Sequence, residues 1–464
     1  MNLCNLNATA LQAMLARRDL SPTELMAATY DRIEAVNPAV NAIVNLLPRD
    51  QAMDLAQAAE NAGPAGALYG MPIAIKDLAN AQGFPTSMGS PLFSATDPMA
   101  KDDIMVARMR AAGAIIIGKT NTPEFGLGSH TTNPVFGPCR NPWDTSKSAG
   151  GSSGGAAVAL ATRMVALADG SDMMGSLRNP VGWTGTYGLR PSFGAVPSEP
   201  MGDSFLHQLA TNGPMARTPE DLALLLSVQA GPDPRQPHGI VLPPAQPARK
   251  LRIGWLGDWN GAFPMEPGVI DCCLNAVNLL ADMGHEVVDL DAGFDAEAMW
   301  DSWITLRSWQ VATGLAPLEA KPNARDLLKP AALWELDRGK AMSATDVHRA
   351  SVTRSQWFTR TAELFAQVDV LALPTAQCWP FDVDWDWPRE IAGNSMDTYH
   401  RWMQVVVPAS LIGLPALAVP AGFGAQGLPM GIQLIGPRAS DFDLLELGKT
   451  YHKAANFAHQ APPL

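Results

Sequence analysis

The chain has 464 residues, of which 47% are hydrophobic and 17% charged, and its formal net charge at pH 7 is −12. This composition is typical of a globular protein with ample apolar material for a core, and the negative charge argues against nucleic acid or an anionic membrane as partner. The five cysteines are too few and too scattered for a disulfide framework and show no metal-ligand spacing, so we expect no metal and no cofactor.

Two stretches could be targeting or membrane segments. Residues 1–20 lack a basic region followed by an apolar one, so we expect no signal peptide. The apolar window Val405–Phe423 is interrupted by Pro408, Pro415 and Pro420, which favours buried strands and turns over a membrane span. We therefore expect a cytoplasmic enzyme without a membrane partner.

The chain begins with helical patterns. Leu6–Ala35 has apolar residues at helical spacing, and Ser21 and Glu24 form a capping-box pattern around Pro22. This pattern predicts a pair of helices. A further helix is predicted over Ala52–Ala62.

A short strand follows at Leu68–Asp77, where a proline precedes a β-branched run that ends at Lys76. A lysine in this position either extends its side chain to water or, if it is buried, loses its proton more readily than usual. The residues alone leave both alternatives open.

A phosphate-loop motif matches Gly113–Thr120 letter for letter. The mechanism behind that motif requires a loop that curls around phosphates, whereas three consecutive isoleucines favour an extended, buried strand at 114–118. We therefore keep nucleotide binding only as the least favoured alternative function. A helix is predicted before it at Asp103–Ala112, and the loop-rich Asn121–Trp143 that follows is expected to help build a site.

The most informative stretch is Ser146–Arg178, which holds two turns rich in glycine and serine, Gly150–Gly155 and Gly170–Ser176. A helix is predicted from Ala156 to about residue 163 and a short buried strand at Met164–Ala168. A serine in such a turn can be exposed beside free backbone N–H groups. A flexible linker is the alternative, but the surrounding small apolar residues argue against it.

The remainder of the chain alternates strands and helices around a polar, proline-rich surface connection at Gly231–Arg249. Such alternation implies an α/β fold, a sheet with helices on both faces. The predicted strands are Leu251–Leu256, Glu286–Leu290 and Val368–Pro374, and the predicted helices are Met215–Ala230, Val269–Met283, Asp295–Trp309, Pro330–Leu336, Ser343–Ala366 and Asp441–Ala458.

A nucleophilic serine needs a neighbouring base, which is usually histidine. No histidine lies in the serine stretch, and His130 is the nearest one upstream. The text around Ser176 also lacks the G-x-S-x-G elbow of the α/β-hydrolases. A lysine can act as the base if burial lowers its pKa far enough to leave it neutral.

The sequence GGSSGG followed by GSDMMGSLR resembles the signature motif of the amidase signature family. The segment LYGMPIAIKD around Lys76 and the closing segment Leu411–Gln433 resemble the same family. In that family a lysine, a serine in a cis peptide and a nucleophilic serine form the catalytic triad. The family's two serines lie 24 positions apart, as Ser152 and Ser176 do here (176 − 152 = 24). The resemblance therefore implies Ser176 as nucleophile, Ser152 as relay and Lys76 as base.

The resemblance also implies an oxyanion hole built from the amides of Met173, Met174 and Gly175, together with that of Ser176. Asp172 is expected to hold this loop by accepting backbone hydrogen bonds. Arg178 is expected to form a buried ion pair or a carbonyl clamp beneath it. Met174 stands where the family commonly has glycine, so we expect it to narrow or reshape the acyl pocket.

The resemblance spans nearly the whole chain and implies one α/β/α domain around a large mixed sheet. We divide residues 1–464 into N-terminal helices at 1–65, a catalytic core at 66–230, a variable substrate-facing segment at 231–400 and closing strands with a helix at 401–464. Nine of the 13 tryptophans fall between Trp300 and Trp402, where most are expected to pack in the core and some to line the pocket.

The expected activity is hydrolysis of a small-molecule carboxamide to a carboxylate and an amine or ammonia. A glutaminase-type subunit of an amidotransferase, which has the same fold and would need a partner chain, is the alternative. The tryptophan-rich C-terminal half suits a hydrophobic acyl group better than glutamine. The sequence leaves open whether the protein is a homodimer.

Overall fold

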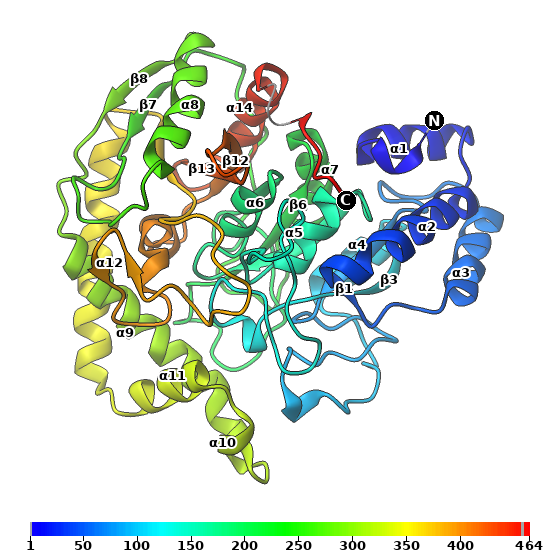
Figure 1. Ribbon diagram of the computed structural model, residues 1–464, viewed down its shortest axis with the longest axis horizontal. Helices are drawn as coiled ribbons and strands as arrows, with labels where there is room; N and C mark the ends of the chain where they lie inside the picture. The colour runs from blue at the N-terminus through cyan, green and yellow to red at the C-terminus, as the bar shows by residue number, and fades with distance from the viewer. Residues whose placement is uncertain (1, 456–458) are drawn as a thin grey trace.

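The computed structural model describes residues 2–455 and 459–464. Its centre is an eight-stranded mixed sheet with helices packed against it (Figure 1), which confirms the predicted α/β class. The strand order is β4-β6-β5-β12-β13-β9-β7-β8. The strands are β4 Leu167–Asp172, β5 Tyr187–Arg190, β6 Thr211–Ala216, β7 Arg252–Trp255, β8 Glu286–Asp289, β9 Val370–Pro374, β12 Ala416–Phe423 and β13 Pro429–Ile435.

Neighbouring strands of this sheet run antiparallel from β4 to β9, whereas β9, β7 and β8 run parallel to one another. A separate two-stranded hairpin consists of β10 Glu390–Ile391 and β11 Asn394–Ser395. The helices are α1 Ala8–Arg17, α2 Pro22–Val40, α3 Arg49–Ala62, α4 Ile104–Ala111, α5 Gly154–Ala161, α6 Asn179–Thr184, α7 Pro219–Gln229, α8 Val269–Asp282, α9 Ala296–Leu315, α10 Ala324–Leu327, α11 Pro330–Lys340, α12 Ala344–Phe365, α13 Val407–Leu411 and α14 Asp441–Ala454.

The N-terminal helices form as predicted, and the capping box between Ser21 and Glu24 is present at the start of α2. These helices lie together at one end of the molecule, shown in blue in Figure 1. The end of the predicted last helix falls partly on residues 456–458, which are outside the described residues. No helix in the described part of the chain is long and apolar enough to cross a membrane.

A second sheet of three strands carries Lys76. Its order is β1-β3-β2, with β1 at Ile43–Val44, β2 at Pro72–Lys76 and β3 at Ile115–Thr120. The end of the phosphate-loop motif is therefore a fully buried strand that runs parallel to β2 and not a phosphate-binding loop. This finding argues against the nucleotide-binding alternative.

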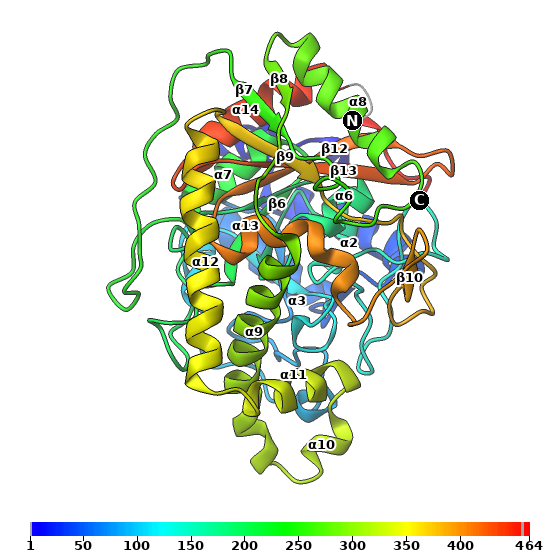
Figure 2. The ribbon, with the colours of Figure 1, turned by 90° about the vertical axis from the view of Figure 1, so that its left-hand side faces the viewer.

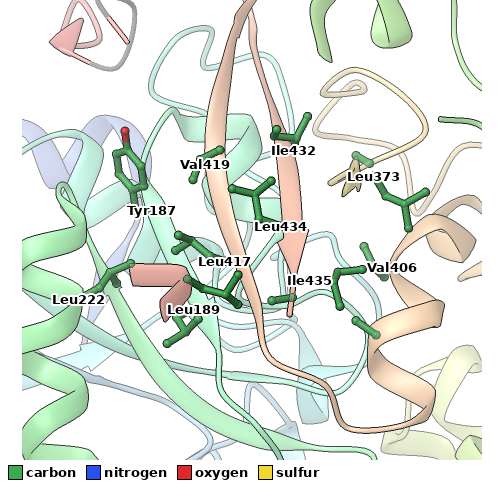
Figure 3. Packing of buried hydrophobic residues seen from close by; sticks show 14 of the residues in the cluster. Tyr187, Leu189, Leu222, Leu373, Val406, Leu417, Val419, Ile432, Leu434 and Ile435 are labelled. Carbon is green, nitrogen blue, oxygen red and sulfur yellow. The ribbon is translucent and has the colours of Figure 1, made fainter. Parts of the chain in front are cut away.

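The core is built around the hairpin of β12 and β13. In Figure 3, Leu417 and Val419 of β12 lie beside Ile432 and Leu434 of β13, and each of these side chains is buried. Full burial of such a side chain contributes about 1.5–3 kcal/mol. Because β12 pairs with β5 and β13 with β9, the closing strands sit in the middle of the sheet and join the two halves of the chain.

Helices α9, α11 and α12 form a group outside the sheet. Figure 2 shows α9 and α12 running side by side, with α11 near their lower ends. Both α11 and α12 pack against α9. This group carries Arg307 and Glu335, which become important at the active site.

One strand differs from its prediction. The strand expected at Met164–Ala168 is β4, Leu167–Asp172, which includes the glycine and serine at the start of the second predicted turn. The reason is tertiary, because every residue of β4 pairs with a residue of β6 in antiparallel register. The turn before the predicted nucleophile is therefore shorter than the sequence suggested.

Candidate active site

The two serine-bearing turns contact one another. Ser152 follows a cis peptide bond after Gly151, and Ser176 lies just before α6. The N–H of Gly151 donates to Asn179 Oδ1 over 3.3 Å, which ties the first turn to the start of α6. Gly150 has a φ of +76°, and a Cβ there would lie 2.6 Å from Asn179 Oδ1, so only glycine allows this approach.

Lys76 points into this junction from the end of β2, and only 1% of its surface is exposed. Its Nζ lies 2.8 Å from Ser152 Oγ, 2.8 Å from Ser153 Oγ and 3.1 Å from Ser171 Oγ. No carboxylate of a described residue is within ion-pair distance of this nitrogen. The structure thus brings the predicted base to the predicted relay serine, and the side chain does not extend to water.

Burial lowers the pKa of Lys76 to about 7, against the opposing effect of negative charge on Asp169 and Asp172. The amine is therefore substantially neutral near pH 7, as a base must be. Asp169 also holds the lysine in place, because its Oδ1 accepts the Lys76 backbone N–H over 2.9 Å. This carboxylate joins β2 to β4, which share no backbone pairing.

The hydroxyl groups around Lys76 restrict its proton arrangement. Ser153 Oγ donates to the Ser171 carbonyl over 3.4 Å, so towards Lys76 it can only accept. A neutral amine has two N–H donors and one lone pair. With one donor used on Ser153, the lone pair is available to accept a proton from Ser152.

Ser176 and the amides before it have free hydrogen-bonding groups. The Ser176 side chain is 6% exposed, and its hydroxyl makes no hydrogen bond within the described part of the chain. The N–H groups of Met173, Met174 and Ser176 likewise donate to no described group. In contrast, the Gly175 N–H donates to Asp172 Oδ1 over 2.8 Å. Of the predicted oxyanion donors, Met173 and Met174 are thus free and Gly175 is engaged.

Asp172 holds the turn as predicted. Its carboxylate accepts the N–H groups of Gly175 and Leu177, at 2.8 and 3.1 Å, and it forms ion pairs with Arg178 and Arg190, both at 3.0 Å. Burial alone would favour the neutral acid, but the two arginines hold the pKa of Asp172 far below its usual range. The turn is therefore fixed by a permanently ionised carboxylate.

Arg178 is the predicted clamp beneath the nucleophile turn. Besides Asp172, its guanidinium donates to the Val406 carbonyl at 3.0 Å, to Gln433 Oε1 at 2.5 Å and to Ser410 Oγ at 2.6 Å. These three acceptors lie in the C-terminal part of the chain. Arg178 thus joins the turn to the closing strands and helices.

His130 does not contact the predicted catalytic serines, Ser152 and Ser176. One ring nitrogen lies 2.8 Å from Ser148 Oγ and the other 3.0 Å from the Val383 carbonyl oxygen. Burial lowers the pKa of His130 to about 4. The structure therefore gives no support to a histidine base.

A cavity of about 490 Å³ opens beside the first turn. Part of its wall is the loop at 127–130, and a Cβ placed on Gly151 would lie 3.2 Å from the carbonyl carbon of Ser129 in this loop. The remaining wall comes from the tryptophan-rich half of the chain and combines aromatic side chains with the charged Lys329, Asp386, Arg389 and Asp397. The aromatic residues that line it are Trp334, Trp387, Tyr399 and Trp402.

Some residues at the site differ from the sequence-based expectation. Met174 is 3% exposed and packs in the main core, and its φ is not in the left-handed region, so the expected role in shaping the pocket has no support. Its neighbour Met173 instead contacts Arg307. Sequence reasoning also missed Ser153 and Ser171, although each lies beside a motif residue and a buried amine needs polar neighbours.

Comparison with known proteins agrees with this geometry. Residues 24–445 match the family model described as Amidase. The chain is 33% identical to an acylamidase from Rhodococcus erythropolis, over 99% of this chain and 98% of that protein. It is also 33% identical to a glutamyl-tRNA(Gln) amidotransferase subunit from Chloroflexus aurantiacus, over 100% of this chain and 99% of that one.

Solved structures show the same similarity. A bacterial aryl acylamidase of the amidase signature enzymes superposes with a TM-score of 0.92 at 29% identity, with 99% of both chains covered. The 6-aminohexanoate cyclic dimer hydrolase in complex with substrate superposes with a TM-score of 0.88 at 24% identity, also over 99% of both chains, and shows the shared fold.

Proposed function

The chain belongs to the amidase signature family and is an amidohydrolase, and we propose that it hydrolyses carboxamides through an acyl-enzyme on Ser176. In this proposal Ser152 relays the proton and Lys76 is the base. The observation that carries it is the position of Lys76 Nζ, which is buried, lies 2.8 Å from Ser152 Oγ and has no carboxylate partner within the described chain.

The first step forms the bond between Ser176 Oγ and the amide carbon. The Ser176 proton passes to Ser152 Oγ as the Ser152 proton passes to Lys76 Nζ. When the tetrahedral intermediate collapses, the C–N bond breaks and the leaving nitrogen takes a proton from Ser152, which Lys76 replaces. Water then attacks the acyl-enzyme and loses its proton along the same route to Lys76. When this second tetrahedral intermediate collapses, the bond between the acyl carbon and Ser176 Oγ breaks and Ser176 takes a proton from Ser152, which Lys76 replaces, so Lys76 ends each cycle neutral.

The relay requires a hydrogen bond from Ser176 to Ser152 in the substrate complex. Catalytic hydrogen bonds are often long or absent in the free enzyme and shorten when substrate binds. The oxyanion would accept from the free amides of Met173 and Met174, joined by that of Ser176. Each such donor contributes about 3 kcal/mol to the stability of the transition state.

The aromatic cavity supports an amide with an aryl or other bulky apolar group as the substrate. Aromatic side chains bind flat apolar groups through buried area and ring contacts, and the volume of about 490 Å³ is within the range of small-molecule sites. The similarity to an acylamidase and to an aryl acylamidase supports the same substrate class.

The alternative function is the glutaminase step of an amidotransferase. The equal identity to a glutamyl-tRNA(Gln) amidotransferase subunit favours it. The charged side chains in the cavity wall, Lys329, Arg389 and Asp397 among them, also offer partners for the amino and carboxylate groups of a free glutamine. A glutaminase of this kind would also need a partner chain to receive the ammonia.

A panel of substrates tests the proposal. We would measure amine or ammonia release from an acetanilide, a long aliphatic amide, propionamide and glutamine, with wild-type protein and Ser176→Ala. We expect the anilide to be preferred and Ser176→Ala to be inactive but folded. A fluorophosphonate probe should label Ser176, and labelling should persist in His130→Ala. Turnover near the wild-type rate in folded Ser176→Ala would refute the acyl-enzyme assignment.

A further inference from the structure

A buried ion pair lies between two helices close to residues 173–176, the turn that carries the proposed oxyanion donors and is named the oxyanion turn. Arg307 of α9 is 2% exposed, and its Nε donates to Glu335 Oε1 of α11 over 2.8 Å. Glu335 is fully buried, and its second oxygen accepts from Ser308 Oγ over 2.5 Å. The charge of the guanidinium is therefore balanced within this cluster, and its orientation is fixed by the carboxylate.

One arm of this guanidinium reaches the oxyanion turn. Arg307 Nη1 donates to Met173 Sδ over 3.1 Å. A buried N–H of a charged group needs an acceptor, because leaving it unpaired costs more than any single hydrogen bond gains. A thioether is a weak acceptor, so this contact holds the Met173 side chain in place more than it stabilises the fold.

The other arm reaches the wall of the aromatic cavity. Arg307 Nη2 donates to the Tyr399 hydroxyl over 2.8 Å, and that hydroxyl donates to Glu335 Oε1 over 2.6 Å. Tyr399 lines the cavity of about 490 Å³. Arg307 thus connects the residue that presents the first oxyanion amide to a residue on the cavity wall.

We propose that Arg307 is a positioning residue of this amidase: through Met173 it orients the oxyanion turn, and through Tyr399 it couples that turn to the group bound in the aromatic cavity. This proposal rests on the proposed function of the turn and of Ser176. It explains why kcat should be higher for a bulky amide than for a small one.

The physical argument is differential binding. A group that fills the cavity contacts Tyr399, and binding energy gained away from the reacting carbon can be used to hold the catalytic groups in their reactive geometry. A small amide leaves the cavity unfilled, does not contact Tyr399, and therefore contributes no binding energy toward ordering the oxyanion turn. Loss of the Arg307 contacts should therefore reduce kcat, and reduce it more for a bulky amide.

The decisive comparison is between two replacements of Met173 of similar size. Met173→Leu keeps the apolar volume but removes the acceptor, whereas Met173→Gln restores an acceptor, a carbonyl oxygen, for Arg307. We expect Met173→Leu to lower kcat for an acetanilide about tenfold with KM nearly unchanged, a modest misplacement of the turn, and Met173→Gln to have a clearly higher kcat than Met173→Leu. If Met173 only fills space, the order of the two variants reverses.

Two further variants and a control complete the experiment. Tyr399→Phe should lower kcat for the acetanilide several-fold more than for propionamide. Met299 is a buried methionine on α9, the helix that carries Arg307, and its side chain makes no hydrogen bond to any described residue, so Met299→Leu should keep wild-type kinetics. Thermal unfolding of each variant shows whether it folds, and any variant that does not fold is left out of the comparison.

The outcomes separate the two proposals. Activity of folded Ser176→Ala would overturn the proposed function. If Ser176→Ala is inactive but Met173→Leu has the kcat of the wild type, or if Met173→Gln is no better than Met173→Leu, only the role of Arg307 is overturned. An equal loss in Met299→Leu would also overturn it, because general packing would then explain the effect.

Discussion

Lys76 and Lys119 lie on adjacent parallel strands one register position apart, and both are buried, yet only Lys119 has a carboxylate within ion-pair distance in the part of the chain that the structure describes. That carboxylate is Asp77, 3.6 Å from Lys119 Nζ. The two lysines therefore have different roles despite similar burial. One is available as a base, and the other balances a buried charge.

The first prediction compares variants of these two lysines. Lys76→Met should lower kcat by about 10²–10⁴-fold, the usual effect of removing a general base. Lys119→Met should leave kcat of the folded protein close to wild type but reduce the free energy of unfolding by about 3–5 kcal/mol, because Asp77 would remain buried without its partner. Steady-state kinetics and urea unfolding measure the two effects, and equal losses of kcat would contradict the assignment.

The second prediction concerns pH. Burial lowers the pKa of Lys76 from 10.5 to about 7, and only the neutral amine accepts a proton. The neutral fraction grows as pH rises, so kcat/KM should increase about tenfold per pH unit below pH 7 and level off above it. The same rise of kcat/KM below pH 7 should appear in His130→Ala. If the residual activity of Lys76→Met shows the same rise of kcat/KM with pH, another group must titrate.

The third prediction concerns Asp172. Asp172→Asn would leave Arg178 and Arg190 buried without a balancing charge, which costs about 3–5 kcal/mol for a broken buried pair. We expect a clear fall in Tm at pH 7 together with loss of activity, because the turn before Ser176 loses its main acceptor. Asp282→Asn, an exposed position at the end of α8, is the control and should change neither property.

The fourth prediction concerns the aromatic cavity. Trp334→Ala should raise KM for an acetanilide by roughly tenfold or more, since an aromatic contact and its buried area are lost, and should leave propionamide nearly unaffected. Trp385→Ala is the matched control, because Trp385 is 55% exposed and is not among the residues that line the cavity. The same change for both substrates would show that Trp334 does not select the acyl or amine group.

Much of the fold is readable from local patterns. The capping box at Ser21 and the β-branched run before Lys76 produced the expected helix and strand, because both patterns act over a few residues. The predicted start of β4 lies three residues too early, since the limits of this strand depend on pairing with β6, about forty to fifty positions away. Tertiary pairing of this kind is not visible in a local pattern.

Only those residues of the candidate site that lie in a recognisable motif could be predicted from the sequence. Lys76 and Ser152 were named from motif text and meet in the structure at 2.8 Å. Arg307 lies in a tryptophan-rich helix outside any motif, and its partners Glu335 and Tyr399 are far from it in the sequence. A buried ion pair of this kind depends on how helices pack, so no spacing in the sequence could have indicated it.

The clamp made by Arg178 has a consequence for synthesis of the protein. Lys76, Ser152 and Ser176 have all been translated when the ribosome reaches residue 400, but the acceptors at 406, 410 and 433 have not. Until they emerge, Asp172 is the one described partner that is available to the guanidinium. A chain truncated before residue 406 would therefore keep all three predicted catalytic residues and lose these three acceptors of the guanidinium.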